Sequence, residues 1–351
     1  MRVLVVNAGS SSVKLRLLGP DDDVEQSADT EPGAELEGVL RDWPVPDAVG
    51  HRVVHGGTRF TDPVVIDAAV RKELEDLTAL APLHQPKSLA GLDAVTALLP
   101  DLPAVACFDT AFHTSIPEAA ATYAVPKQWR ERYAIRRYGF HGLSHAWCSA
   151  RVAELTGARR IVTAHLGAGA SLAAVLDGRS VDTTMGFTPL EGLVMATRSG
   201  TVDPGLVLWL EEHEHLSPHE IAETLEKRSG LAALAGTPDM REVLAAAARD
   251  EPDAVLARDA YVHRLAAGIA SMAAATGGIG ALAFTGGVGE HAGEIRTRTA
   301  QRLAFLGVAV DPALDDTVDG EITAAGAAVR TVVVPAREDL EIARGTRAAL
   351  R

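Results

Sequence analysis

The chain has 351 residues, of which 47% are hydrophobic and 23% charged, so it is not a mainly disordered protein and it is long enough for two domains. Its formal net charge of −14 argues against a nucleic-acid partner, because phosphate backbones repel an acidic surface. Only two cysteines occur, Cys107 and Cys148, so we expect no disulfide framework and a reducing cytoplasm as the compartment.

The N-terminal part begins with two apolar runs around a turn of small residues at 7–12, which predicts a β-hairpin over 3–18. A polar, acidic stretch at 21–46 predicts loops and edge elements. Further elements predicted from hydrophobic spacing are buried strands over 48–54 and 104–108 and helices over 67–80 and 88–99.

The segment 160–176 repeats the pattern of the N-terminal hairpin. In both segments an apolar strand meets one polar residue, Asn7 or His165, and a small-residue turn leads into a second apolar strand. This predicts two similar lobes, each opening with a hairpin, and chance likeness of two hairpins is the alternative. Later elements are predicted as a strand near 181–186, strands over 281–284 and 330–334, and helices over 206–212, 218–228, 253–276 and 338–350.

The stretch 265–289 carries no charged residue and is long enough to cross a bilayer. However, Thr276-Gly277-Gly278 interrupts it and is typical of a helix C-terminus. We therefore expect a buried helix, a glycine cap and a strand at this place, and no membrane segment.

Glycine-rich turns follow strands at three places, 7–12, 165–171 and 285–290. Turns of this kind let backbone amides approach phosphate oxygens, although tight turns in a glycine-rich protein are the alternative. The P-loop pattern GxxxxGK[ST] is absent.

Two arginines in glycine-flanked segments, Arg52 and Arg198, could clamp a carboxylate or phosphate with paired hydrogen bonds, or could form surface ion pairs. Asp109 and Glu338 could bind Mg²⁺, or could serve as a helix cap and a first-turn acid. No histidine pair has zinc spacing, so we expect no structural metal.

Six segments together are typical of one enzyme family. They are NAGSSSVK at 7–14, GHRVVHGG at 50–57, APLH at 81–84, FDTAFH at 108–113, RYGFHG at 137–142 and MGFTPLEG at 185–192. Through them the chain resembles, almost end to end, the acetate kinase family of acetate and propionate kinases. The resemblance implies an α/β fold of two duplicated actin-like, ribonuclease H-like lobes, with mixed sheets flanked by helices and an ATP cleft between the lobes. It places the acyl-substrate lobe at 1–113 with 339–351, and the nucleotide lobe, with the dimer interface, at 114–338.

The family resemblance also implies a reaction. It is the reversible, ATP-dependent phosphorylation of acetate to acetyl phosphate by direct in-line transfer with Mg²⁺, or alternatively Mn²⁺. The enzyme would be a cytoplasmic homodimer whose partners are acetate and ATP, with no nucleic acid and no membrane. The implied roles are catalysis by Asp109, His141 and Arg198; metal binding by Asn7 and Glu338; substrate binding by Arg52, Val54, Leu83, His84, Phe140 and Pro189; and ATP binding by Ser10, Ser12, Lys14, His165, Leu166, Gly167, Ala168, Gly169, Asp239, Met240, Arg241, Gly287, Val288, Gly289, Glu290 and His291.

The chain departs from the family pattern at several positions near the implied nucleotide site. Ala168, Gln85 and His291 stand where the family usually has Asn, and Thr201 stands where it usually has an acid. We expect altered ATP affinity or donor choice with activity retained. Should asparagine at position 168 bring no gain, His291 and Gln85 would be the first candidates for a replacement hydrogen-bond donor. The alternatives are a propionate or butyrate kinase, and a catalytically weakened nucleotide-binding protein of the same fold.

Overall fold

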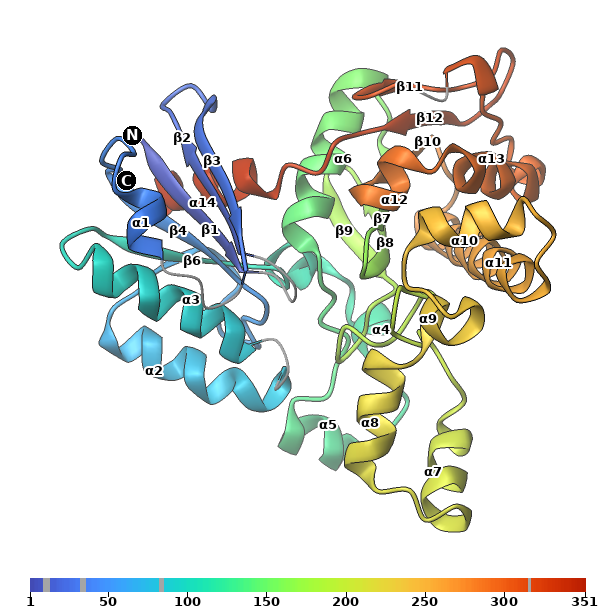
Figure 1. The fold of residues 1–351 in the computed structure, drawn as a ribbon, viewed down its shortest axis with the longest axis horizontal. Helices are drawn as coiled ribbons and strands as arrows, with labels where there is room; N and C mark the ends of the chain where they lie inside the picture. Colours follow the sequence, from blue (N-terminus) through green and yellow to red (C-terminus); the bar gives the residue numbers. More distant parts are fainter. Residues whose placement is uncertain (9–12, 32–35, 82–84, 315–316) are drawn as a thin grey trace. The chain divides into compact units, whose positions relative to one another are not determined.

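The computed structural model describes residues 1–8, 13–31, 36–81, 85–314 and 317–351 (Figure 1). The chain forms two compact units. The first unit contains Met1–Thr114, Phe140–Trp147 and Arg337–Arg351, and the second contains Ser115–Gly139 and Cys148–Ala336.

The first unit is built on one mixed sheet. Its strands are β1 (Val3–Ala8), β2 (Val13–Leu18), β3 (Val24–Thr30), β4 (Ala48–Val53), β5 (Val64–Val65) and β6 (Ala104–Phe108). Their order is β3-β2-β1-β4-β6-β5. The pairs β3–β2 and β2–β1 are antiparallel, the pairs β1–β4 and β4–β6 are parallel, and the edge strand β5 is antiparallel to β6.

Helices cover both faces of this sheet, which explains why its central strand is continuously apolar. They are α1 (Leu36–Leu40), α2 (Ala68–Asp76), α3 (Gln85–Leu98), α14 (Glu338–Ala349) and the start of α6 (Gly142–Thr156), with 3₁₀ turns at Leu77–Leu80 and Ala111–Ser115. Leu4 and Val6 of β1 share a core cluster with Val95 of α3, whereas Val3 packs with Leu340 of α14 on the opposite face. The alternation follows the two-residue period of a strand.

The elements predicted for this unit are confirmed with small shifts at their ends. The helix predicted over 67–80 is α2 followed by a 3₁₀ turn, and the Asp67 carboxylate caps it by accepting a 2.8 Å bond from the Val70 amide. The acidic stretch 21–46 contains the edge strand β3 and the short helix α1. The first glycine-rich turn falls mostly on 9–12, outside the described residues.

The second unit repeats the strand arrangement of the first. Its strands are β7 (Arg160–Leu166), β8 (Ala170–Leu176), β9 (Arg179–Thr183), β10 (Ala281–Thr285), β11 (Gly320–Glu321) and β12 (Arg330–Val333). Taken from the opposite edge, the order is β9-β8-β7-β10-β12-β11. As in the first unit, the first three strands in this order, β9, β8 and β7, are each antiparallel to the next. The following two, β10 and β12, are added in parallel to β7, and the edge strand β11 is antiparallel to β12. This shared topology confirms the two similar lobes predicted from the hairpin repeat and the duplicated actin-like sheets that the family resemblance implies.

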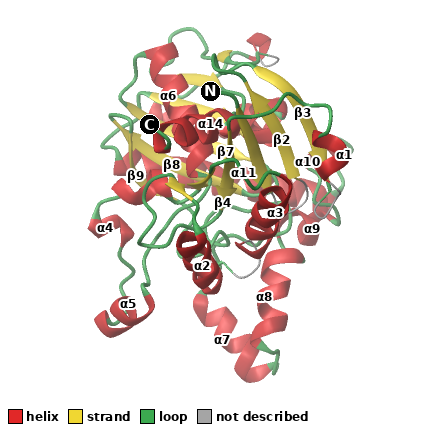
Figure 2. Ribbon diagram, turned by 90° about the vertical axis from the view of Figure 1, so that its left-hand side faces the viewer, coloured by secondary structure: helices red, strands yellow, loops and turns green. Residues whose placement is uncertain are grey.

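Several helices accompany the strands of the second unit, and some of them lie away from its sheet (Figure 2). They are the remainder of α6, α4 (Glu118–Ala121), α5 (Lys127–Tyr133), α7 (Pro204–His213), α8 (Pro218–Lys227), α9 (Gly230–Ala235), α10 (Met240–Ala247), α11 (Pro252–Ala275), α12 (Gly286–His291) and α13 (Gly293–Arg302), with 3₁₀ turns at Ala304–Leu306 and Pro312–Leu314. As predicted, α11 ends near Thr276, which is its C-cap residue, and glycines with positive φ, Gly277 and Gly278, lead into β10. None of the helices described combines the length and apolar character that crossing a bilayer requires.

One sequence expectation needs correction here, and one helix was not expected. The residues 285–290 do not form a turn like that of a hairpin, because α12 starts directly after β10 and includes five of them. The helix α6 was not predicted, since its residues show no clear apolar period in the sequence.

Candidate active site

In the first unit, four polar side chains converge at the ends of the parallel strands. Asn7 lies near the end of β1, Arg52 near the end of β4, and Asp109 directly after β6, while Glu338 is the first residue of α14. Parallel strands end at the same edge of a sheet, which is where open α/β sheets place their ligands. All four residues are candidates on sequence grounds, but nothing in the sequence shows that they meet.

Hydrogen bonds link these four side chains into one chain of contacts. Arg52 grips the Asp109 carboxylate, with Nε 2.9 and 3.1 Å from its two oxygens and Nη2 2.5 Å from Oδ2. Arg52 Nη1 donates to Asn7 Oδ1 at 3.2 Å, and Asn7 Nδ2 donates to Glu338 Oε2 at 2.6 Å. The guanidinium is therefore held in one orientation by fixed partners on two sides.

Burial shifts the pKa values of both members of the Arg52–Asp109 ion pair. Asp109 is 1% exposed, and the Arg52 side chain is 14% exposed. Burial raises the pKa of the Asp109 carboxyl, and the charge and hydrogen bonds of Arg52 oppose that shift. For Arg52, burial alone would lower the pKa, but the charges of Asp109 and Glu338 raise it above its usual value. The arginine thus stays cationic beside the acids.

The loop that carries His141 is fixed against Asp109 by a close backbone approach. The Gly142 amide donates to the Asp109 carbonyl at 2.8 Å. A Cβ on Gly142 would lie 2.2 Å from that same oxygen, so only glycine fits. His141 has φ +55°, a left-handed conformation that is uncommon for a residue with a side chain. Phe140 is buried, and its carbonyl lies 3.0 Å from His113 Nε2. Glycine at 142 therefore keeps the His141 segment next to the Arg52–Asp109 pair.

Gln85 has a structural task that the sequence analysis did not assign to it. Its buried amide accepts from the His55 amide and donates to the carbonyls of His55 and Leu74, each at 3.2 Å. These bonds hold the segment that follows Val54, which is itself buried. Because both donor hydrogens of Gln85 are used, the expectation that Gln85 replaces the donor lost at Ala168 is wrong.

In the second unit, the equivalent strand ends carry the second group of candidate residues. His165 of β7 pairs with Ser171 across its hairpin and with Thr285 of the parallel strand β10. The turn is closed by the Gly167 amide, which donates to the Gly169 carbonyl at 3.0 Å. A Cβ on Gly286 would lie 2.8 Å from the Leu166 carbonyl, so α12 starts close against this turn. Figure 1 shows α12 beside β7 and β10.

Arg198 lies in a loop that joins the same region. The Ala196 amide donates to the Ala168 carbonyl at 3.1 Å, which attaches the loop to the exposed tip of the turn. Arg198 Nη1 donates to the carbonyl of Pro189, a buried residue, at 3.1 Å. Gly230 has positive φ, and a Cβ there would meet the carbonyls of Met195 and Arg198. The Arg198 loop is therefore tightly packed.

Pro189 belongs to a segment that a polar cluster holds in place. Glu191 accepts from Arg137 at 2.8 Å and from the Tyr123 hydroxyl. A Cβ on Gly186 would overlap both Glu191 and Tyr123. The sequence analysis did not assign roles to these residues, and only the conspicuous motif around Gly186 offered a signal, because Tyr123 and Glu191 are far apart in the sequence.

Further candidate residues lie on the first hairpin, at the start of α10 or outside the described residues. Lys14 faces Asn7 across the first hairpin and is exposed. Asp239 and Arg241 pair with each other at the start of α10, where the side chain and backbone amide of Arg241 lower the pKa of Asp239 to about 2. Four candidates, Ser10, Ser12, Leu83 and His84, fall outside the described residues.

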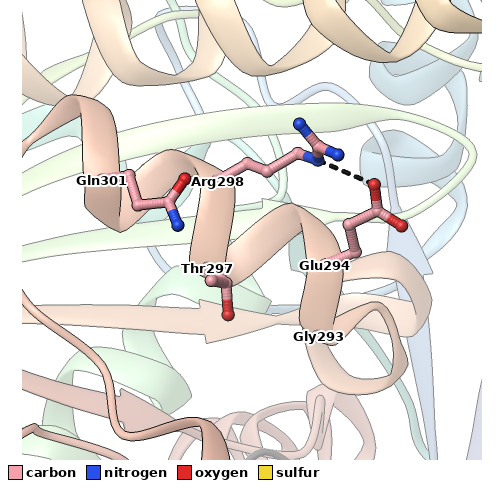
Figure 3. A pocket seen from close by; sticks show the side chains of 5 residues that line it. All are labelled: Gly293, Glu294, Thr297, Arg298 and Gln301. Carbon is pink, nitrogen blue, oxygen red and sulfur yellow. Dashed lines mark hydrogen bonds and ion pairs between the residues drawn. The ribbon is translucent and has the colours of Figure 1, made fainter.

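Metal-ligand clustering and one surface hollow can be compared with the positions of the candidate residues. Over the residues with a described position, no three His, Cys, Asp or Glu side chains gather as a metal site would require. Figure 3 shows a hollow on α13 lined by Gly293, Glu294, Thr297, Arg298 and Gln301. Its charged residues Glu294 and Arg298 are paired with each other, 2.7 Å apart, and none of the candidate residues lines it.

Comparison with known proteins identifies the family of the chain. A family model described as the acetokinase family matches residues 45–344. An acetate kinase from Deinococcus deserti is 45% identical, with 100% of this chain and 98% of the relative covered. Among solved structures, a propionate kinase from Francisella tularensis has a TM-score of 0.92 at 36% identity, covering 99% of each chain. Porphyromonas gingivalis acetate kinase has a TM-score of 0.90 at 37% identity over 100% of both chains. The fold and the converging strand ends define a phosphotransferase of the actin-like class. The chain belongs to the acetokinase family.

Proposed function

We propose that this protein phosphorylates acetate with ATP, reversibly, to give acetyl phosphate. The observation that carries the proposal is the buried Arg52–Asp109 pair at the end of parallel strands, beside Asn7 and Glu338. Family membership and near-complete coverage of relatives named acetate kinase support the same activity.

The chemistry of the acceptor explains why a charged cluster suits this reaction. Acetate is already ionised at neutral pH, so the enzyme needs no general base to activate it. The obstacle is bringing one anion to another in line. We propose that Arg52 binds the acetate carboxylate, because Asp109 fixes its orientation. Asp109 acts here as a positioning residue.

Asn7 and Glu338 fit a magnesium site because they combine an amide oxygen and a carboxylate, and Mg²⁺ is often held by one or two such groups together with phosphates and waters. Their side chains lie side by side, since Asn7 Nδ2 donates to Glu338 Oε2 at 2.6 Å, and the Asn7 amide oxygen would have to exchange its bond from Arg52 Nη1 for the metal. Bound there, Mg²⁺ would neutralise phosphate charge, and Mn²⁺ could serve instead.

The second unit supplies the proposed nucleotide residues. We propose that the turn 165–169, the segment 239–241 and part of α12 bind ATP, and that Lys14, Ser10 and Ser12 of the first unit contribute to phosphate binding. Arg198 and His141 would stabilise charge on the phosphoryl group during transfer. In other phosphotransferases an arginine in this role is worth about 10³–10⁵ in rate. The division into an acyl lobe, 1–113 with 339–351, and a nucleotide lobe, 114–338, remains part of this proposal.

The direct test is a hydroxamate assay for acyl phosphate with acetate, propionate and butyrate, each with ATP, GTP or pyrophosphate. Acetyl phosphate formed from ATP is the expected product, and activity absent with all three acids would refute the proposal. A propionate or butyrate preference is the second candidate, favoured by the similarity to a propionate kinase structure. The proposed acyl pocket, with Val54, Leu83, His84, Phe140 and Pro189, distinguishes these acids by only about 1–3 kcal/mol per methylene.

We also propose a homodimer in the cytoplasm. Helix α7 has no buried residue, and its Leu206, Leu208 and Trp209 are about half exposed. An apolar helix face of this kind is typical of an interface between subunits. Trp209→Glu should convert a dimer into a monomer in light-scattering measurements, and an unchanged mass would contradict an interface at α7. The cytoplasmic location is supported by two buried, unbridged cysteines.

A further inference from the structure

Helix α12 contains a glutamate whose contacts are not those of a nucleotide ligand. The Glu290 Oε1 atom accepts from the Gly286 amide at 2.9 Å and from the Ala336 amide at 3.0 Å. The first bond caps the start of its own helix, whose N-cap residue Thr285 supplies no side-chain bond. The second bond joins α12 to a segment 46 residues away in the sequence.

The position of Ala336 gives this second bond its importance. The Val334 amide still pairs with the Phe284 carbonyl at 2.9 Å, as an extension of the parallel strands. Ala336 is the last residue of the second unit, and the chain enters the first unit at Arg337. Glu338, the proposed metal residue, follows two positions after Ala336. Glu290 therefore holds the chain at the point where it leaves the second unit.

The other side of α12 is fixed as well. The buried Arg296 of α13 donates from Nη1 to the carbonyls of Gly289 and Glu290, at 2.8 and 2.7 Å. Gly286 packs against Leu166 of the proposed nucleotide turn. Contacts thus fix the α12 backbone at both ends: Arg296 binds carbonyls near its C-terminal end, and Gly286 packs against β7 at its start. The Glu290 side chain supplies the hydrogen bond to the first residue of the helix.

We propose that Glu290 is a positioning residue that does not bind ATP directly. It fixes the start of α12 to the chain at Ala336, where the chain leaves the second unit. This inference rests on the proposed function for its kinetic consequences. It revises the role that family resemblance implies for Glu290. Both hydrogen bonds use the single atom Oε1. This positioning role therefore requires an acceptor oxygen at the end of a side chain of this length, and it does not require a negative charge.

A pair of conservative variants separates the two roles. Glu290→Gln keeps the length and one carbonyl oxygen, which can accept two hydrogen bonds, and removes the charge. Glu290→Asp keeps the charge and shortens the reach by one methylene. We expect Glu290→Gln to retain kcat/KM for ATP within about threefold and Glu290→Asp to lose about tenfold, the effect of roughly 1.4 kcal/mol. The KM for acetate should change in neither variant. The opposite order, with Asp active and Gln impaired, would overturn the proposal.

Hydrogen exchange tests the same inference without relying on activity. The Gly286 and Ala336 amides should exchange more than tenfold faster in Glu290→Asp than in the wild type and in Glu290→Gln. Equal exchange at Ala336 in all three proteins would also overturn it. Glu294→Gln, at an ion pair on α13, is the matched control and should change neither readout. If the wild type makes no acetyl phosphate, the proposed function fails, and the exchange result still decides the role of Glu290.

Discussion

The Arg52–Asp109 pair allows structural and catalytic roles to be separated by a double-mutant cycle. Asp109→Leu leaves a buried guanidinium without its partner, and Arg52→Met leaves a carboxylate that is 1% exposed without its counter-charge. Breaking a buried ion pair from one side costs about 3–5 kcal/mol. Because the Arg52 side chain keeps 14% exposure, we expect about 3 kcal/mol for each single change.

The double variant Arg52→Met/Asp109→Leu removes both charges and replaces them with side chains of similar size. Such replacements are often close to neutral, so the double variant should be more stable than either single variant. Independent changes would together cost about 6 kcal/mol, so the coupling energy should exceed about 3 kcal/mol, measured by urea unfolding. Trp43 and Trp147 belong to the first unit and would report it by fluorescence once Trp129 and Trp209 are replaced by phenylalanine.

Activity should not follow stability in this cycle. All three variants should lose at least 100-fold in kcat/KM for acetate, an effect of about 2.7 kcal/mol, because the oriented positive charge is missing in each. The reasoning is refuted if the two single changes add within about 0.5 kcal/mol, since independent sites behave in that way. Recovery of activity in the double variant would show that Arg52 does not bind the substrate.

Three further changes test the other proposed roles. Arg198→Ala should lower kcat by at least about 100-fold without unfolding the protein, because its charge acts mainly in the transition state, and a near-normal kcat would remove it from the site. Val54→Ala should shift relative kcat/KM toward propionate and butyrate, and unchanged ratios among the three acids would show that other residues line the pocket. Ala168→Asn should raise kcat/KM for ATP about tenfold and leave the acetate KM alone, because a hydrogen bond to a charged group contributes about 1.5–3 kcal/mol. No gain would mean that the turn, whose Ala168 carbonyl is bonded to Ala196, has been rebuilt around alanine.

Local patterns in the sequence determined most elements of this protein and named its candidate residues. Apolar runs indicate the buried strands because neighbouring helices cover both sheet faces. The repeated hairpin predicts the duplication, which the shared topology of the two sheets confirms. Family motifs identified Arg52, Asp109 and Glu338 individually, since each motif is contiguous in the chain.

The roles of particular side chains were decided only by the tertiary structure. Asp109 meets Arg52 across 57 positions, Glu338 meets Asn7 across 331, and Glu290 meets Ala336 across 46. Hydrogen bonds and burial depend on which groups the folded chain brings within about 3 Å, and no local period records that distance. For the same reason Gln85 looked like a free donor in the sequence and is fully engaged with backbone in the structure.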